Sequence, residues 1–179
     1  TATSWLHGLR SSSQDRTNVA FANASTTSST TLRLTLFDGQ VSGSGSPQNV
    51  VLADVVLGPG QWKQGDDVFA GKGFSQGYAS VSVVSGAGPY FAYAVFNDAD
   101  TNDGSLAPFE VEPVAAGNRL VPVVVETGRY ASELVLTNTT SGAQTVELSY
   151  VESLSPESGA GGVATESLAA GEQKLIPSV

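Results

Sequence analysis

Apolar and polar residues alternate along much of this chain with a period of two, which predicts β-strands. The clearest example is the stretch 17–39, in which Val19 and Phe21 share one face. After a run of Ser and Thr, leucines at 32, 34 and 36 alternate with polar residues. Two alternating runs joined by a short polar turn predict a β-hairpin.

Further strands are predicted wherever the alternation resumes. They lie at 5–10, 49–57, 61–64, 77–84, 89–96 and 106–111. The run Ser85-Gly86-Ala87-Gly88 joins two of them, so 77–96 predicts a second hairpin. Residues 65–70 predict one helical turn, because Asp66 is a good N-cap and Asp67 adds a second acid at the positive helix end.

The pattern of the first hairpin returns near the C-terminus. A second alternating pair of runs places Asn138 where Asn23 lies in the first, each followed by a polar turn. The stretch Val55–Lys63 also matches Glu166–Lys174 in order and spacing. Self-similarity of this kind predicts a tandem repeat of β-modules.

The repeat predicts an all-β chain of two tandem antiparallel β-sandwich modules, residues 1–113 and 114–179. The second module reaches only the counterpart of Asp66, so nothing in it corresponds to the hairpin 77–96. We therefore expect apolar faces and strand edges that are left open. Either the chain is part of a longer protein, or another chain supplies the missing strands.

Composition and charge narrow the classes of partner. Hydrophobic residues make up 40% of the chain, enough for ordinary cores. The chain contains no cysteine, which excludes disulfides and thiolate-ligated metals. The net charge of −9, with Lys and Arg scattered, argues against nucleic acid. No apolar run approaches the roughly 20 residues of a membrane helix, so membrane insertion is not expected.

Three stretches together resemble a known family. They are the strand Arg129–Thr140, the turn Leu168–Lys174, and Gly77–Val84 followed by Phe91–Asp98. This succession resembles the tandem immunoglobulin-like β-sandwich repeats of large secreted and cell-surface proteins of bacteria, over nearly the whole chain. The resemblance implies an extracellular location and work as a spacer, stalk or adhesive module. It carries no catalytic motif and implies no cofactor.

Catalytic chemistry has little support in the sequence. A Ser/His/Asp hydrolase needs a histidine, and the only one, His7, lies in a predicted strand. No Gly-x-Ser-x-Gly elbow surrounds any serine. Paired carboxylates of a glycosidase could come from Asp66, Asp67 and Asp98, although adjacent acids more often form a solvated turn or a helix cap. We expect a protein that is not an enzyme.

The loop 97–105 is the sharpest candidate for a metal site. Asp98, Asp100 and Asn102 repeat the alternate oxygen spacing of a calcium loop, and Asp103 adds a carboxylate. However, Asp103 stands where an EF-hand loop has glycine, and Phe109 stands where it has glutamate. The alternative is a hairpin loop with positive φ at its Asp-Gly pair and solvated acids.

Aromatic residues suggest a carbohydrate site. The candidates for stacking on a glycan are Trp62, Tyr78 and Tyr90, with Tyr93 beside them. The alternative is core packing, because sandwiches need large inward-facing side chains.

Asn23 and Asn138 both begin an Asn-x-Ser/Thr triplet, at equivalent positions of the two repeats. We interpret this repetition as structural, because an asparagine at a strand end bonds nearby backbone and starts a turn.

These observations favour a non-catalytic structural or adhesive protein. One version is a polymerising subunit, whose second module accepts a strand from a neighbouring copy. The segment Trp5–Arg10 is the candidate donor. The alternative is a carbohydrate-binding module of a secreted enzyme.

Overall fold

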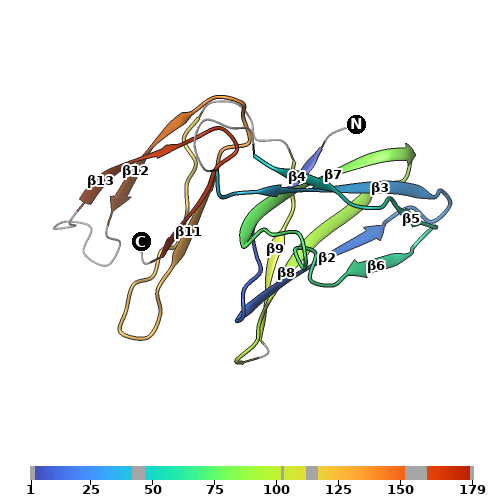
Figure 1. The fold of residues 1–179 in the computed structure, drawn as a ribbon, viewed down its shortest axis with the longest axis horizontal. Coiled ribbons are helices and arrows are strands. Elements are labelled where there is room, and N and C mark those ends of the chain that lie inside the picture. The colour runs from blue at the N-terminus through green and yellow to red at the C-terminus, as the bar shows by residue number, and fades with distance from the viewer. Residues whose placement is uncertain (1–2, 42–46, 102, 112–116, 152–160, 178–179) are drawn as a thin grey trace.

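The structure, a computed structural model, describes residues 3–41, 47–101, 103–111, 117–151 and 161–177 (Figure 1). Within these ranges the chain forms β-strands and no helix, so the all-β prediction is confirmed. Accordingly, no described helix has the length and apolar character needed to cross a bilayer. Every strand pair is antiparallel.

The first module contains two large sheets. One has the order β10-β1-β7-β3-β4, with β5 also paired to β3, and the other has the order β6-β2-β8-β9. Their strands are β1 (Ser4–Arg10), β2 (Asp15–Asn23), β3 (Thr30–Asp38), β4 (Asn49–Val51), β5 (Val55–Leu57), β6 (Trp62–Gly65), β7 (Gln76–Gly86), β8 (Tyr90–Asp98), β9 (Gly104–Pro108) and β10 (Glu110–Val111).

The two sheets share one hydrophobic core in a sandwich-like arrangement. Val19 and Phe21 point into it from β2, and Leu32 and Leu34 from β3, each at most 2% exposed. Each such side chain contributes about 1.5–3 kcal/mol when fully buried. The alternation seen in the sequence therefore correctly marks the inward faces of these strands.

The predicted hairpin 17–39 is wrong, because its two strands lie in opposite sheets. β2 pairs with β6 and β8, whereas β3 pairs with β4, β5 and β7. The connection is an arch, by which we mean a turn that carries the chain from one sheet to the other. The period-two pattern is the same for a hairpin and an arch, since it marks the buried face and not the partner strand.

The predicted hairpin 77–96 is wrong for the same reason. β7 lies between β1 and β3, whereas β8 lies between β2 and β9 in the facing sheet. The connection between β5 and β6 also crosses from one sheet to the other. A true hairpin joins β8 to β9, with Asn97 opposite Gly104.

The predicted helical turn at 65–70 is a pair of successive tight turns instead. Ala70 N donates to Asp67 O, and Lys72 N donates to Phe69 O. Asp67 has a φ of 37°, which is outside the helical region. The amides of Asp67 and Val68 donate to β2, and this tertiary pairing prevails over the local capping signal.

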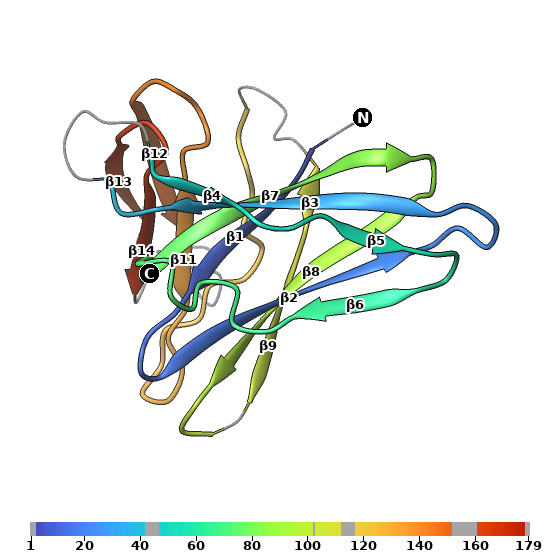
Figure 2. The ribbon, with the colours of Figure 1, turned by 45° about the vertical axis from the view of Figure 1, so that its right-hand side comes forward.

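The second module consists of two separate two-stranded ribbons (Figures 1 and 2). β11 pairs with β14, and β12 pairs with β13. These strands are β11 (Glu133–Thr137), β12 (Gln144–Val151), β13 (Gly161–Leu168) and β14 (Gln173–Pro177). The boundary predicted between 113 and 114 falls outside the described residues.

The second module rests on the first through β14 and β11. Gln173 is 1% exposed, its Oε1 accepts a hydrogen bond from Gly8 N at 2.8 Å, and its own amide donates to Gly39 O at 3.0 Å. Arg10 forms an ion pair with Glu133. Gly8 has a φ of +74° at the bulge in β1, a conformation that favours glycine.

Candidate functional site

The predicted repeat is present in three dimensions, and it centres on Asn23. Asn23 Nδ2 donates to the carbonyls of Ser28, Leu57 and Gly58 at 2.8, 3.2 and 3.0 Å. Its Oδ1 accepts from Ser25 N at 2.9 Å. The side chain is 2% exposed, so it ties the turn after β2 to the end of β5 inside the protein.

Asn138 makes the same network in the second module. Its Nδ2 donates to the carbonyls of Gly142, Leu168 and Ala169 at 2.8, 3.5 and 2.8 Å, and its Oδ1 accepts from Thr140 N. The side chain is 5% exposed. The structural interpretation of the two Asn-x-Ser/Thr triplets is therefore confirmed, because both amides are buried and bonded to backbone.

The turn that follows is also repeated bond for bond. Gly58 N donates to Gln61 Oε1 at 2.8 Å, and Ala169 N donates to Glu172 Oε2 at 2.6 Å. Ala22 stands opposite Trp62 in the β2–β6 pair, as Thr137 stands opposite Gln173 in the β11–β14 pair. The match of Val55–Lys63 with Glu166–Lys174 thus extends to strand register.

The repeat also reaches back to the start of the second module, which the sequence comparison missed. Arg10 N donates to Thr17 Oγ1, and Val125 N donates to Ser132 Oγ with the same separation along the chain. Ser12 N bonds Asp15 O as Thr127 N bonds Tyr130 O, both at 2.8 Å. The residues 120–125 therefore correspond to β1, and the shared serine and threonine hydroxyls were the available signal.

Among the described residues of the second module, nothing corresponds to β7 or β8. Each of β11 and β12 has one strand partner among the described residues, whereas β2 and β3 are paired on both sides. Leu32, Leu34 and Leu36 are at most 2% exposed, but Tyr150, the counterpart of Leu36, is 48% exposed. Four more apolar positions facing the same interior are only partly buried: Leu134, Leu136, Val146 and Leu148.

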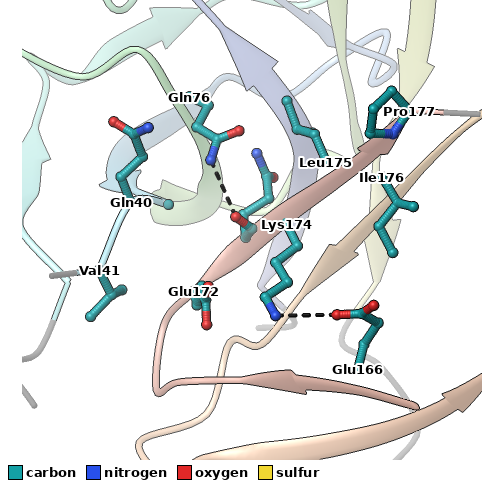
Figure 3. Close-up of a pocket in the computed structure, with 11 residues that line it drawn as sticks. Gln40, Val41, Gln76, Glu166, Glu172, Lys174, Leu175, Ile176 and Pro177 are labelled. Carbon is teal, nitrogen blue, oxygen red and sulfur yellow. Dashed lines mark hydrogen bonds and ion pairs between the residues drawn. The ribbon is translucent and has the colours of Figure 1, made fainter. Parts of the chain in front are cut away.

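An open groove of about 550 Å³ lies beside this exposed interior (Figure 3). It runs along β14 and is bordered by Gln40 and Gln76 of the first module. Lys174 and Glu166 point toward each other across it, with Nζ and Oε2 3.2 Å apart. The groove carries one ion pair between the ribbons, and its apolar lining includes Leu175 and Ile176 of β14.

The candidate calcium loop is the hairpin connection between β8 and β9. Asp98 Oδ1 accepts hydrogen bonds from the amides of Asp100 and Thr101 at 2.7 and 3.0 Å, and Asp98 N donates to Asp103 O. Asp98 thus forms the turn itself. The alternative prediction of a hairpin loop is confirmed, but its Asp103-Gly104 pair does not have the positive φ that was expected. Asn102 lies outside the described residues, and calcium binding stays a prediction.

Of the three predicted glycan-stacking aromatics, Tyr78 is buried and Tyr90 is partly buried. Tyr78 is 2% exposed and stacks on Phe37 at 5.0 Å, and burial raises the pKa of Tyr78 to about 12. Tyr90 turns inward, where its hydroxyl bonds Ser4 Oγ at 2.8 Å and donates to Val81 O. Tyr78 and Tyr90 therefore contribute to packing, because each side chain points toward neighbouring strands and not toward water.

Trp62 is exposed, as the glycan prediction requires. The residue is 53% exposed, and its Nε1 donates to Tyr93 Oη at 3.1 Å. Phe91 is 45% exposed, and its ring centroid lies 5.8 Å from that of Tyr93. These three rings, which we call the aromatic platform, stand on the outer face of β6, β2 and β8. Ala22 pairs with both Trp62 and Phe91, so a small side chain separates them.

The other candidate residues serve the first module. Asp66 accepts from Gln64, and Asp67 accepts from Ser11. The candidate donor Trp5–Arg10 is β1, which is paired with β7 and β10, and its Leu6 and Leu9 are fully buried. Donation of this strand to another chain would require it to leave its own core.

Comparisons with protein-family models, curated proteins and solved structures find no significant match to this chain.

Proposed function

We propose that this chain is a non-catalytic structural or adhesive protein of the extracellular surface, built from two tandem immunoglobulin-like modules. It joins other chains through its open second module, as a subunit of a surface assembly or as a spacer in one. The observation that carries the proposal is that β11 and β12 each have an edge without a strand partner in the described part of the chain, with partly exposed apolar side chains between them. The extracellular location rests on the resemblance alone.

Unpaired edges and apolar faces are the features that strand addition between chains uses. Adding a strand supplies main-chain hydrogen bonds to an edge, and alternate side chains of the added strand fill the apolar interior. The first module indicates how far such an interior can be closed, because Leu36 is 0% exposed there.

Light scattering over a concentration range, combined with hydrogen exchange, tests this proposal. We expect oligomers that form only at high concentration, because copies with a net charge of −9 repel one another, and in which the β12 amides are protected. Leu148→Asp, on the inward face, should reduce assembly, whereas Ser149→Asp, on the outward face of the same strand, should not. A monomer with freely exchanging β12 amides would exclude self-association and leave only association with a different chain. A monomer with strongly protected β11 and β12 amides would overturn it.

The aromatic platform favours a second candidate function, glycan binding by a carbohydrate-binding module. Exposed Trp and Tyr rings offer flat apolar faces with a polar edge, and the Trp62–Tyr93 hydrogen bond fixes two of them relative to each other. Trp62→Ala should abolish retention on polysaccharide columns. His7→Gln, far from the platform, is the control. Retention of the unchanged chain on none of the polysaccharides would remove this candidate.

A further inference from the structure

We infer that the open second module accepts a two-strand arch with the side-chain pattern of Gln76–Asp98, contributed by residues outside 1–179. In the first module this arch is β7 and β8. The inference rests on the proposed function and deepens it, because it names the segment that enters and the order of its side chains.

The first strand of the arch belongs between residues 120–125 and β12. In the first module β7 lies between β1 and β3, their counterparts, and is hydrogen-bonded to both. In the first module β1 pairs with β7 and not with β3. The stretch 120–125 corresponds to β1, so it has no strand to pair with until a counterpart of β7 is present. Its side chains are accordingly exposed, 89% for Leu120 and 70% for Val123. One inserted strand would pair with residues 120–125 on one side and with β12 on the other.

The side chains that this first strand must present follow from register. In the first module Val83 stands opposite Leu32, and Val81 stands opposite Leu34. Val146 and Leu148 occupy those positions in β12, so the entering strand needs β-branched residues at the same alternate positions. Tyr150 takes the place of Leu36, whose partner is Ala79, so a small residue is required there.

The second strand of the arch belongs beside β11. In the first module Ala94 stands opposite Val19, and Ala92 stands opposite Phe21. Leu134 and Leu136 are the counterparts of Val19 and Phe21 in β11. Large side chains on β11 therefore again call for small residues on the entering strand.

The turn of the arch must carry a glycine next to Asn138. In the first module a side chain at Gly88 would place its Cβ 2.6 Å from Asn23 Oδ1, so only glycine fits. Ala24 N donates to Pro89 O at 2.8 Å in the same turn. Its counterpart Thr139 N has no hydrogen bond among the described residues, and the carbonyl of the entering turn can accept from it.

Charge favours an arch of this composition over contact between two open faces. The chain carries a net charge of −9, so copies repel one another, whereas Gln76–Asp98 contains a single charged side chain, Asp98. The arch of a second copy is already committed, since Val81, Ala92 and Ala94 are 0% exposed in its own core. The entering arch is therefore not the one that a copy already uses in its own first module.

The test adds a synthetic peptide of residues 76–98 to the full chain and follows hydrogen exchange of β11 and β12. We expect exchange to slow by about tenfold or more, because both strands become internal. A peptide with Val81→Asp and Val83→Asp should have no effect, whereas one with Ser80→Asp and Ser82→Asp, which changes the outward face, should still protect. A Gly88→Val peptide should fail like the inward variant.

A covalent version keeps the inference testable if the peptide is insoluble. Residues 69–111 are appended directly after Val179, which continues the repeat in register, with the same substitutions as controls. Unchanged exchange of β11 and β12 in both experiments, or equal protection by inward and outward variants, would overturn the inference. If the arch slows exchange of β11 and β12 while the chain alone stays a monomer at every concentration, the proposed self-assembly fails and the side-chain match stands. If the chain assembles but the arch has no effect, the reverse holds.

Discussion

The two modules build the same asparagine-centred turn in different surroundings. In the first module the turn joins two sheets that close around a core, and Leu34 is 2% exposed. In the second it joins two ribbons, and the counterparts of core residues stay partly exposed. The hydrogen bonds of Asn23 and Asn138 nevertheless match partner for partner. Local polar geometry is thus independent of closure, whereas burial depends on β7 and β8, which have no counterpart among the residues described in the second module.

The largest difference should appear when equivalent apolar residues are shortened. Leu34→Ala should lower the free energy of unfolding of the first module by about 3 kcal/mol, since the buried site cannot relax fully. Leu148→Ala should cost less than about 1 kcal/mol, because its site is already open to water. Urea unfolding of both variants measures this. Equal losses would mean that the second module is as closed as the first.

The asparagines test whether the shared turn stabilises both modules. Asn23→Ala leaves buried carbonyls without a donor and should cost about 1–3 kcal/mol of unfolding free energy. Asn138→Ala should act locally, raising amide exchange around residues 138–142 and 168–172 with little effect on global unfolding. Asn18→Ala, which removes one bond to Asp67 N, is a control in the first module. A global loss from Asn138→Ala equal to that from Asn23→Ala would contradict the independence of the two modules.

The junction between the modules depends on Gln173. Gln173→Ala removes the acceptor of Gly8 N, and exchange of that amide should become about tenfold faster through local opening. Gln76→Ala, which removes only the 3.3 Å bond to Gln173 O, should have a smaller effect. Exchange at Gly8 that is the same in both variants would show that the backbone pairing of Gln173 with Gly39 alone holds the junction.

The smallest effect is a pH dependence confined to the first module. Burial lowers the pKa of His7 below its ordinary value of 6.5, and the nearby charge of Glu110 only partly opposes this. The unfolded chain therefore binds the proton more readily, so stability falls as the pH drops from 6.5 toward the folded pKa. His7→Gln should flatten this part of the stability curve without changing exchange in β12. An unchanged curve would show that His7 is protonated at no cost.

Several features of this protein were determined by its sequence alone. Alternation identified the strands and the inward faces of residues such as Val19 and Leu34, because a strand turns alternate side chains to opposite sides. The paired asparagines and the absence of a counterpart to 77–96 identified the repeat and its open second half. Local spacing was enough to identify the repeat, because each asparagine bonds the backbone of the turn that follows it and of one further tight turn, and this further turn has the same spacing in the two modules.

Tertiary structure alone decided which strands are neighbours. The stretches 17–39 and 77–96 form arches and not hairpins, since a period of two is satisfied by either connection. It also decided which aromatic residues face water. Tyr78 is buried, Tyr90 is partly buried against the core and Phe91 is exposed, because the element that covers each face comes from a distant part of the chain. The helical signal at 65–70 yielded to hydrogen bonds with β2, since a single turn gains less from its own bonds than from pairing with a sheet.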